Sequence, residues 1–415
     1  MSDDLVIVGG GLEGYLAALS AKQADSTASV RVLAQEGRFD TETGLIDLLG
    51  YEPGGTEPVT EPLAAIESLP ETHRYATLGT ETVESALALF DEVTGEHYSG
   101  GATRKNALFP TATGQLTPAA RYPESFAAGL ASTQLPMRLI GFERVADFDA
   151  ELAADRLDER LPYDVRGSTV TTSLAVSEPP VAVEMAALFE DDREEATRRA
   201  QLAETLEPEL DTEPRIGIPA VLGEGSATLI RDSLSESLHA RIFEIPLGPP
   251  SVPGRRLESL LLDVLADHDI SVEHPASVTD IGVRDGEISE VSATAGDETT
   301  AYEASAFVLT TGGIRDGGLE KKSREIVEPL LDCPVSVPAE DEAVVSGQFL
   351  GDHPAVRAGI TTDEALQPLD SSGEVLYENL HAAGRLLESS NVVADRSASG
   401  LSIVTGFEAG RRAVE

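Results

Sequence analysis

A glycine turn close to the first residue constrains the fold of this chain more than any other feature. Residues 4–8 read Asp-Leu-Val-Ile-Val, and helical spacing of apolar residues begins at Leu12. A short apolar run that breaks at glycines and resumes with helical spacing predicts a buried strand that leads directly into a helix. The glycines are Gly9, Gly11 and Gly14, which match the spacing G-x-G-x-x-G. This stretch therefore predicts an α/β fold that begins with a strand and a helix over 12–24.

Each glycine of this spacing has a physical role at a phosphate site. Gly9 permits the tight turn, Gly11 lets the backbone approach a phosphate, and Gly14 lets helix and strand pack closely. The N-terminus of the helix presents free N–H groups and a charge of about +0.5, which attract an anion. Taken alone the motif is weak, because glycine turns between strand and helix are common. Since a second strand follows, we predict that Gly9, Gly10, Gly11 and Gly14 bind a dinucleotide pyrophosphate.

The second strand of the predicted βαβ unit spans 29–34 and ends without the expected acid. In a dinucleotide site, an acidic residue about 20 residues beyond the glycines binds the ribose hydroxyls. Ala34 stands at that place, with Gln35 next and Glu36 two positions late. Either Glu36 binds the ribose from a displaced position or the contact is absent, and both alternatives stay open.

The charge balance excludes some partners. The chain has 73 acidic and 30 basic residues, a formal net charge of −43 and only four lysines. Such a chain should repel nucleic acid and anionic membrane surfaces, so we expect neither as a partner. A hydrophobic fraction of 41% is nevertheless that of a globular protein. We interpret the composition as halophilic, because molar salt screens charges over about 3 Å and makes the self-repulsion tolerable.

The cysteine content bears on which metal centres the chain could hold, and the hydropathy bears on its location in the cell. Cys333 is the single cysteine, so the sequence offers no disulfide framework and no cysteine cluster for zinc or iron–sulfur. We therefore expect no metal, and an iron–sulfur electron carrier would have to lie on another chain. The sequence has neither a run of about 20 apolar residues nor a basic leader before an apolar run. A cytoplasmic protein without direct membrane insertion is the expectation.

The middle of the chain returns toward the glycine turn by a recognisable route. A predicted helix over 255–268 and several strands lead to an apolar strand that stops at Thr311-Gly312-Gly313. In two-domain flavoproteins the chain returns to the nucleotide domain in this order, and the last strand places a small residue and a glycine beside the dinucleotide. A plain strand and turn would give the same pattern. Together with the glycine turn, the pattern favours a flavin, with Thr311 and Gly312 as candidate ligands.

Two later segments also fit a flavin. A predicted strand stops at Gly384, and a helix begins at small residues that include Gly400 and Leu401. These would cradle the isoalloxazine, and the helix dipole would favour a reduced, anionic flavin. Gly44, after the second strand, is a further candidate, although Thr43 could instead cap a helix there.

The domain organisation follows from where these segments lie. Residues 73–250 carry no second nucleotide fingerprint and alternate short strands, such as 137–142, with helices. We predict that they form an inserted α+β cap domain. The flavin-binding domain then comprises three parts, and an excursion on the cap side precedes the last of them. The three parts are 1–72, 251–313 and 351–415, and the excursion is 314–350.

Six segments carry a resemblance to a known family: VIVGGGLEGYLAAL, TGLIDLL, LGPPSVPGRRLESLL, FVLTTGG, GITTDEALQP and NLHAAG. With these segments the chain resembles the B subunit of the anaerobic glycerol-3-phosphate dehydrogenase over nearly its whole length. GITTDEALQP and GPPSVPG discriminate the family, because many flavoproteins share the other segments. The resemblance implies a Rossmann-like FAD/NAD(P)-binding flavoprotein fold of the fumarate-reductase and succinate-dehydrogenase-flavoprotein type.

The resemblance also implies a function and partners. It implies FMN as the cofactor, with FAD as the alternative, in a complex with a catalytic A subunit that carries FAD and a membrane-bound iron–sulfur C subunit. That complex oxidises sn-glycerol 3-phosphate to dihydroxyacetone phosphate and passes electrons to quinone, on the cytoplasmic side of the cell membrane. One departure matters: the family's glycine run before the last helix reads Ser397-Ala398-Ser399-Gly400 here.

Candidates for the substrate chemistry are few. Oxidation of a secondary alcohol needs a base, and His353 is the best-placed histidine. Arg255 opens a helix after a Pro-Gly turn and could bind a phosphate. A surface histidine and a salt-bridging arginine are the more ordinary interpretations of these residues. We therefore expect this chain to relay electrons. The alternatives are a self-sufficient FAD-dependent oxidoreductase of the fumarate-reductase-like class and a flavin-free scaffold protein within the complex.

Overall fold

The computed structural model describes residues 2–172, 182–190, 194–296, 298–322, 325–337, 357–388 and 395–415. The chain forms two compact units. Unit 1 consists of Met1–Arg38, Tyr51–Thr94 and Leu261–Glu415, and unit 2 consists of Phe39–Gly50 and Gly95–Leu260. The domain boundaries expected from the sequence, with a cap at 73–250, stay a prediction.

Unit 1 is built on a seven-stranded sheet in the order β11-β2-β1-β14-β13-β12, in which β19 also pairs with β14. The pairs β1/β2, β1/β14, β2/β11 and β14/β19 are parallel, whereas β12, β13 and β14 form an antiparallel meander. The strands are β1 (Asp3–Val8), β2 (Val30–Leu33), β11 (Ser271–Glu273), β12 (Ser277–Arg284), β13 (Glu287–Ala295), β14 (Glu298–Leu309) and β19 (Leu380–Ala382).

The last four residues of the central strand β1 are apolar, because strands flank this strand on both edges and helices pack on it. Residues Leu5–Val8 are buried, as a strand inside a parallel sheet requires. β14 is long enough to serve two partners. Its first half pairs with β13, and its second half, from Ala304 onward, pairs with β1. The meander is thereby tied to the parallel sheet by one continuous strand.

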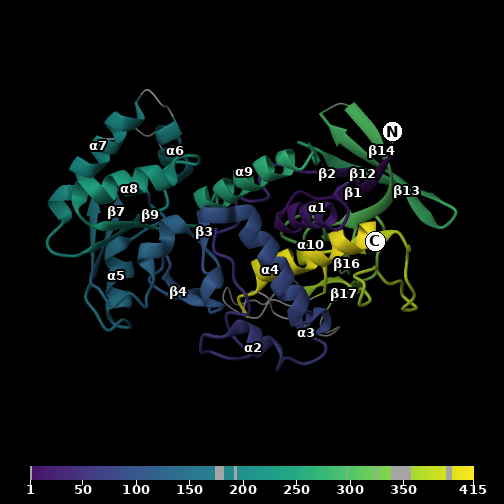
Figure 1. Ribbon diagram of the computed structural model, residues 1–415, viewed down its shortest axis with the longest axis horizontal. Helices are drawn as coiled ribbons and strands as arrows, with labels where there is room; N and C mark the ends of the chain where they lie inside the picture. The colour runs from purple at the N-terminus through teal and green to yellow at the C-terminus, as the bar shows by residue number, and fades with distance from the viewer. Residues whose placement is uncertain are drawn as a thin grey trace. The chain divides into compact units, whose positions relative to one another are not determined.

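Helix α1 (Leu12–Ala24) follows β1 with the bounds that the apolar spacing predicts, and it is packed against α10 (Ala398–Val414). Figure 1 shows the two helices, purple and yellow, beside each other. The packing is close because glycines of α10 face the backbone of α1. A Cβ atom at Gly406 would overlap the carbonyl oxygen of Glu13, and one at Gly410 would overlap that of Ala17. Ser20 Oγ also donates a hydrogen bond to the carbonyl oxygen of Phe407 at 2.6 Å.

The remaining elements of unit 1 lie outside the large sheet. Helix α4 (Thr80–Thr94) packs against α10, and α3 (Arg74–Leu78) packs against α4. The boundary between the two units falls within α9 (Val252–Asp267). The others are α2 (Pro62–Ile66), β15 (Glu320–Lys322), β16 (Glu325–Val327), β17 (Val335–Ser336), β18 (Gly359–Ile360) and the 3-10 turn η7 (Gly384–Leu386).

Unit 2 contains a four-stranded sheet in the order β10-β9-β7-β8 with every pair parallel. Its strands are β7 (Met137–Phe142), β8 (Val165–Val170), β9 (Arg215–Pro219) and β10 (Arg241–Ile245). Helices connect these strands, since parallel neighbours need crossover connections. The helices are α5 (Ala150–Asp158), α6 (Ala182–Ala187), α7 (Glu195–Leu206) and α8 (Ala227–Leu238). Two small antiparallel pairs of strands are β3/β6 (Tyr98–Ser99, Tyr122–Pro123) and β4/β5 (Ala107–Pro110, Leu116–Ala119).

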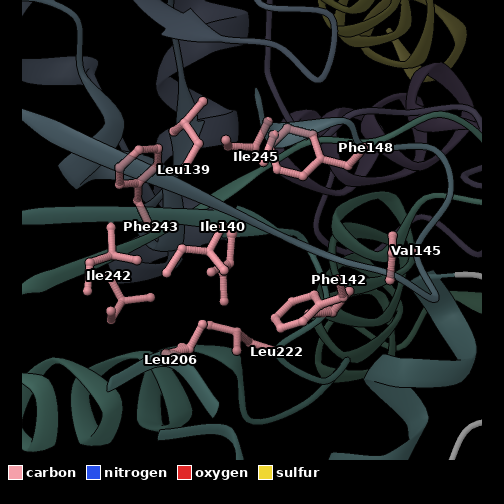
Figure 2. Packing of buried hydrophobic residues seen from close by; sticks show 14 of the residues in the cluster. Leu139, Ile140, Phe142, Val145, Phe148, Leu206, Leu222, Ile242, Phe243 and Ile245 are labelled. Carbon is pink, nitrogen blue, oxygen red and sulfur yellow. The ribbon is translucent and has the colours of Figure 1, made fainter. Parts of the chain in front are cut away.

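The core of unit 2 lies between this sheet and its helices. Figure 2 shows side chains of β7 and β10, such as Ile140 and Phe243, packed with Leu206 at the end of α7 and Leu222 after β9. All four side chains are fully buried. Unit 2 therefore has a hydrophobic core of its own, as an inserted domain requires.

Replacing Gly410 by valine should destabilise the protein, because the new side chain would overlap the carbonyl oxygen of Ala17 and push α10 away from α1. Overpacking of this kind costs about 1–3 kcal/mol. Gly248→Ala is the matched control, since nothing lies within 4 Å of a Cβ atom at that position. Thermal unfolding in molar salt should show a lower melting temperature for Gly410→Val alone. Equal melting temperatures for the two variants would contradict the close packing of α1 and α10.

Candidate functional site

The glycine turn after β1 leaves no room for side chains. Gly9 has a φ of +125°, and a Cβ atom there would overlap the carbonyl oxygen of Thr310. A Cβ atom at Gly14 would likewise overlap the carbonyl oxygen of Gly9. Thr310 completes the arrangement, because its N–H donates to Val8 O at 2.8 Å and its Oγ1 donates to Gly9 O at 2.9 Å. The start of α1 is thus held directly against the ends of β1 and β14.

The N-terminus of α1 offers hydrogen-bond donors. Gly11 is the N-cap residue, and no side chain caps the helix. The first N–H groups of a helix have no partner within the helix, so an uncapped start can bind an anion. Glu13, in the first turn, is buried with 1% of its surface exposed. The turn therefore combines an anion-binding helix start with a buried acidic side chain.

A cavity of about 360 Å³ lies at the carboxyl ends of β1, β2 and β14. Ligands of open α/β sheets bind outside this edge of the sheet, and the volume is within the range of about 300–1,000 Å³ for ligand pockets. Its walls come from the glycine turn, the segment after β2, the start of β12 and the segment after β14. The lining residues are Val8, Gly9, Gly10, Leu33, Gln35, Arg38, Ala276, Val278, Thr279, Thr311, Gly317, Gly318, Glu320, Glu328, Pro329 and Leu330.

Arg38 is the basic side chain that lines this cavity. Its Nη1 donates to the carbonyl oxygen of Asp316 at 2.8 Å, whereas its Nη2 is buried without a hydrogen-bond partner. No carboxylate of the described residues forms an ion pair with it, whereas other arginines of this acidic chain, such as Arg255 and Arg256, are paired. A guanidinium with a vacant donor in a cavity is suited to bind an anion. Sequence reasoning missed Arg38, although arginines near the end of the second strand are known to bind phosphate in dinucleotide sites.

At the end of β2, where an acidic residue is expected, Ala34 makes only backbone hydrogen bonds. The N–H of Ala34 donates to Glu273 O at 2.9 Å, and its carbonyl oxygen accepts from Ala276 N at 2.7 Å. Glu36 is exposed and does not line the cavity, while Gln35 does. Gln35 Nε2 donates to Ser277 Oγ at 3.0 Å. A ribose contact by Glu36 stays a prediction, and Gln35 is the polar side chain present at this wall.

The two predicted residues after β14 lie at the same edge of the sheet. Thr311 lines the cavity, and its Oγ1 is buried without a hydrogen-bond partner. Gly312 has a φ of +84°, and a Cβ atom there would lie 2.5 Å from Arg38 Nη2. A side chain at position 312 would therefore displace the guanidinium.

The later predicted residues lie at the ends of β19 and α10 in unit 1. Gly384 follows β19, has a φ of +75° and donates its N–H to Thr405 Oγ1 at 2.9 Å. Gly400 and Leu401 lie in the first turn of α10, whose N-cap residue is Ser397. The fold thus brings Gly384, Gly400 and Leu401 into the same unit as the glycine turn. Their contact with a flavin stays a prediction.

Gly44 and Arg255 lie in unit 2. Gly44 has a φ of +81° and is close to Pro253 and Pro123, and the segment around it forms no helix that Thr43 could cap. Arg255 Nε lies 2.7 Å from Asp40 Oδ1, and its Nη1 lies 3.5 Å from Glu224 Oε1. The hydrogen bond to Asp40 raises the pKa of this guanidinium above its ordinary value.

The ion pairs give Arg255 a salt-bridging position, so a contact with a phosphate would require Arg255 to exchange a partner. His353 lies outside the described residues. Of the other histidines, His381 on β19 is buried, and its Nδ1 lies 2.9 Å from the carbonyl oxygen of Ala365. Burial lowers the pKa of His381, which keeps the ring neutral at neutral pH.

A buried carboxyl group forms part of the cavity wall. Glu328 accepts hydrogen bonds from the N–H groups of Leu330 and Leu331 at 2.9 and 2.8 Å. Its burial raises its pKa, and the thiol of Cys333 also donates a hydrogen bond to it. Burial, together with the nearby Glu328 carboxylate, raises the pKa of Cys333 to about 12.

Cys333 should accordingly be unreactive in the native protein. The thiolate is the reactive form, and a pKa of about 12 leaves very little of it at pH 8. We expect Ellman's reagent to label the native chain at least about 100-fold more slowly than the chain unfolded in guanidinium chloride. Glutathione at the same pH is the control for the reagent. Complete labelling of the native chain within the time of the control would contradict the burial of this thiol.

The sequence of this chain matches a known family of flavin-binding domains. The FAD binding domain family matches residues 4–401 of the chain. The match extends over nearly the whole sequence and begins at β1. It confirms the flavoprotein fold that the glycine turn and the returning strands predict.

Full-length relatives narrow the class to a family. The B subunit of a probable anaerobic glycerol-3-phosphate dehydrogenase from Halobacterium salinarum is 36% identical over 431 residues, which cover 100% of this chain and 98% of the relative. The B subunit of an anaerobic glycerol-3-phosphate dehydrogenase from Aliivibrio fischeri is 25% identical over 449 residues, which cover 100% of this chain and 96% of the relative. The chain therefore belongs to the family of anaerobic glycerol-3-phosphate dehydrogenase B subunits, as the six sequence segments predict.

Two features are not found among the described residues. Within the described ranges, no helix has the length and hydropathy that crossing a membrane requires. The same residues bring together no group of three or more His, Cys, Asp or Glu side chains that could hold a metal ion.

Proposed function

We propose that this chain is the flavin-binding, electron-relaying component of a quinone-dependent glycerol-3-phosphate dehydrogenase complex. The complex would oxidise sn-glycerol 3-phosphate to dihydroxyacetone phosphate and pass the electrons to quinone. The observation that carries the proposal is the cavity beside an uncapped helix start, in a chain whose full-length relatives are B subunits of such dehydrogenases.

The proposal includes partners. A catalytic A subunit with bound FAD would hold the substrate, and a membrane-bound iron–sulfur C subunit would attach the complex to the cytoplasmic side of the membrane. Two features support this division of labour. The single cysteine cannot hold an iron–sulfur cluster, and Arg255, the phosphate-binding candidate, is already paired with Asp40.

The residues present fit a flavin nucleotide. The glycines beside Thr310 form a cradle that side chains would fill, and Arg38 Nη2 and Thr311 Oγ1 are buried without partners. Backbone N–H groups at the start of α1 would hold the phosphates, and Arg38 would add a charged donor. When bound, the flavin supplies the capacity to accept and donate electrons. The chain's own residues would orient it and exclude water from its phosphates.

FAD, the alternative at the level of sequence, is the cofactor we propose in place of FMN. The cavity continues past the glycine turn to Leu33 and Gln35 at the end of β2, where an adenosine half would lie. FMN would leave this part of the cavity empty. The match to the FAD binding domain family supports the same choice.

The cofactor can be identified directly. We expect the chain, purified in molar salt, to show flavin absorption, and mass spectrometry of the released cofactor to give the mass of FAD. Release of FMN alone would reject the adenosine site. Absence of flavin in protein that unfolds cooperatively would favour the flavin-free scaffold. Oxidation of glycerol 3-phosphate by the isolated chain with an artificial acceptor would favour the self-sufficient oxidoreductase.

Replacing Arg38 by alanine should weaken FAD binding by about 10- to 100-fold, the loss expected for one or two charge-assisted hydrogen bonds. Titration calorimetry with FAD measures the change. Arg166→Ala is the matched control, because the side chain of Arg166 is 55% exposed and belongs to unit 2. An unchanged dissociation constant in Arg38→Ala would exclude Arg38 from the phosphate site.

A further inference from the structure

The glycine turn contains a buried acidic side chain that the proposed binding of phosphate does not use. Glu13 is the second residue of α1, and only 1% of its surface is exposed. Its Oε1 is buried and has no hydrogen-bond partner among the described residues. A buried carboxylate oxygen without a partner is costly, so its retention at this place needs a physical reason.

The surroundings fix where the Glu13 carboxylate lies. A Cβ atom at Gly11 would lie 3.2 Å from Glu13 Oε2 and 3.4 Å from Oε1. A Cβ atom at Gly384 would lie 2.6 Å from Glu13 Cδ and 2.7 Å from Oε1. The carboxylate is therefore enclosed between the N-cap residue of α1 and the end of β19. Both flanking positions are glycines, and each leaves the space that this side chain occupies.

The charge of this carboxylate decides what it can bind. A phosphate in direct contact with this carboxylate would be repelled, because like charges in a buried site interact strongly. A hydroxyl group can instead donate a hydrogen bond to it. Glu13 does not line the cavity that contains Arg38, so the acidic and the basic side chain lie at different places around the turn. A flavin nucleotide carries both complementary groups, a phosphate and a polyhydroxyl chain.

We propose that Glu13 is a flavin-positioning residue whose buried carboxylate accepts a hydrogen bond from a hydroxyl of the flavin's ribityl chain. The proposal rests on the proposed function, since it requires that the chain binds flavin. A ribityl hydroxyl would lie next to the Glu13 carboxylate, and the first N–H groups of α1 and Arg38 would hold the phosphates. No metal, proton transfer or covalent step is involved.

A purely structural role would also keep an acid at this position. A carboxylate in the first turn stabilises a helix through the helix dipole by about 0.3–1 kcal/mol. That role would act on α1 as a whole and would affect every ligand of the turn alike. A ribityl contact affects only ligands that possess the ribityl chain, and this difference separates the two roles.

The test compares FAD with ADP, which has the pyrophosphate and adenosine but no ribityl chain. Dissociation constants of both ligands are measured by calorimetry on the dialysed full chain, for the wild type, Glu13→Ala and Glu13→Gln. Glu151→Gln is the matched control, because Glu151 is an exposed acid in the first turn of α5. Thermal unfolding checks that each variant folds.

We expect Glu13→Ala to weaken FAD binding about tenfold and to leave ADP binding within about twofold of the wild type. Glu13→Gln keeps one acceptor oxygen and should weaken FAD binding about fivefold. If Glu13→Ala does not fold, the comparison of FAD with ADP is made on Glu13→Gln alone. The Glu151→Gln control should match the wild type with both ligands.

Three results would overturn the inference while leaving the proposed function intact, provided that the wild type binds FAD. They are equal weakening for FAD and ADP, tighter binding of both ligands, and unchanged binding of FAD in the Glu13 variants. A folded wild type that binds no flavin would overturn the proposed function as well.

Discussion

The close approach of α1 to the ends of β1 and β14 is the constraint on which the rest of unit 1 depends. Gly9 and Gly14 allow it, and Thr310 stabilises it by donating hydrogen bonds to the carbonyl oxygens of Val8 and Gly9. Helix α10 then packs closely on α1 through Gly406 and Gly410. Because backbone meets backbone both at the glycine turn and at the contact with α10, the start of this helix is held in one position. A ligand held by backbone N–H groups needs such rigidity.

Charge is distributed unevenly around that rigid turn. Among 73 acidic and 30 basic residues, a cation is easily neutralised, as the pairing of Arg255 with Asp40 and Glu224 shows. Arg38 makes no such pair among the described residues and donates only to a carbonyl oxygen. Glu13 is likewise buried without a partner for one of its oxygens. Arg38 thus offers a hydrogen-bond donor without a partner, and Glu13 offers an acceptor without one. This combination suits a ligand that is anionic at one end and carries hydroxyl groups at the other.

The sequence predicts the parts of this structure that depend on local spacing. The bounds of α1 and β7, the glycine turn and the residues Thr311 and Gly312 at the end of β14 follow from runs of a few residues. The sequence alone could not single out Arg38 as a binding residue. Only the fold shows that its side chain lines the cavity and forms no ion pair among the described residues. The parallel pairing in unit 2 is also beyond local spacing, since a short apolar strand does not specify its partner. The same limit applies to Gly44, whose neighbours Pro253 and Pro123 are distant in sequence.

The contact between α1 and α10 has a consequence for synthesis. Ser20 and its hydrogen-bond partner Phe407 are 387 positions apart in the chain. At about 5–20 residues per second, a ribosome needs on the order of tens of seconds to make the intervening segment. During that time α1 exposes the apolar face that α10 later covers. Until α10 has been synthesised, the nascent chain therefore lacks the helix that packs against α1 next to the glycine turn.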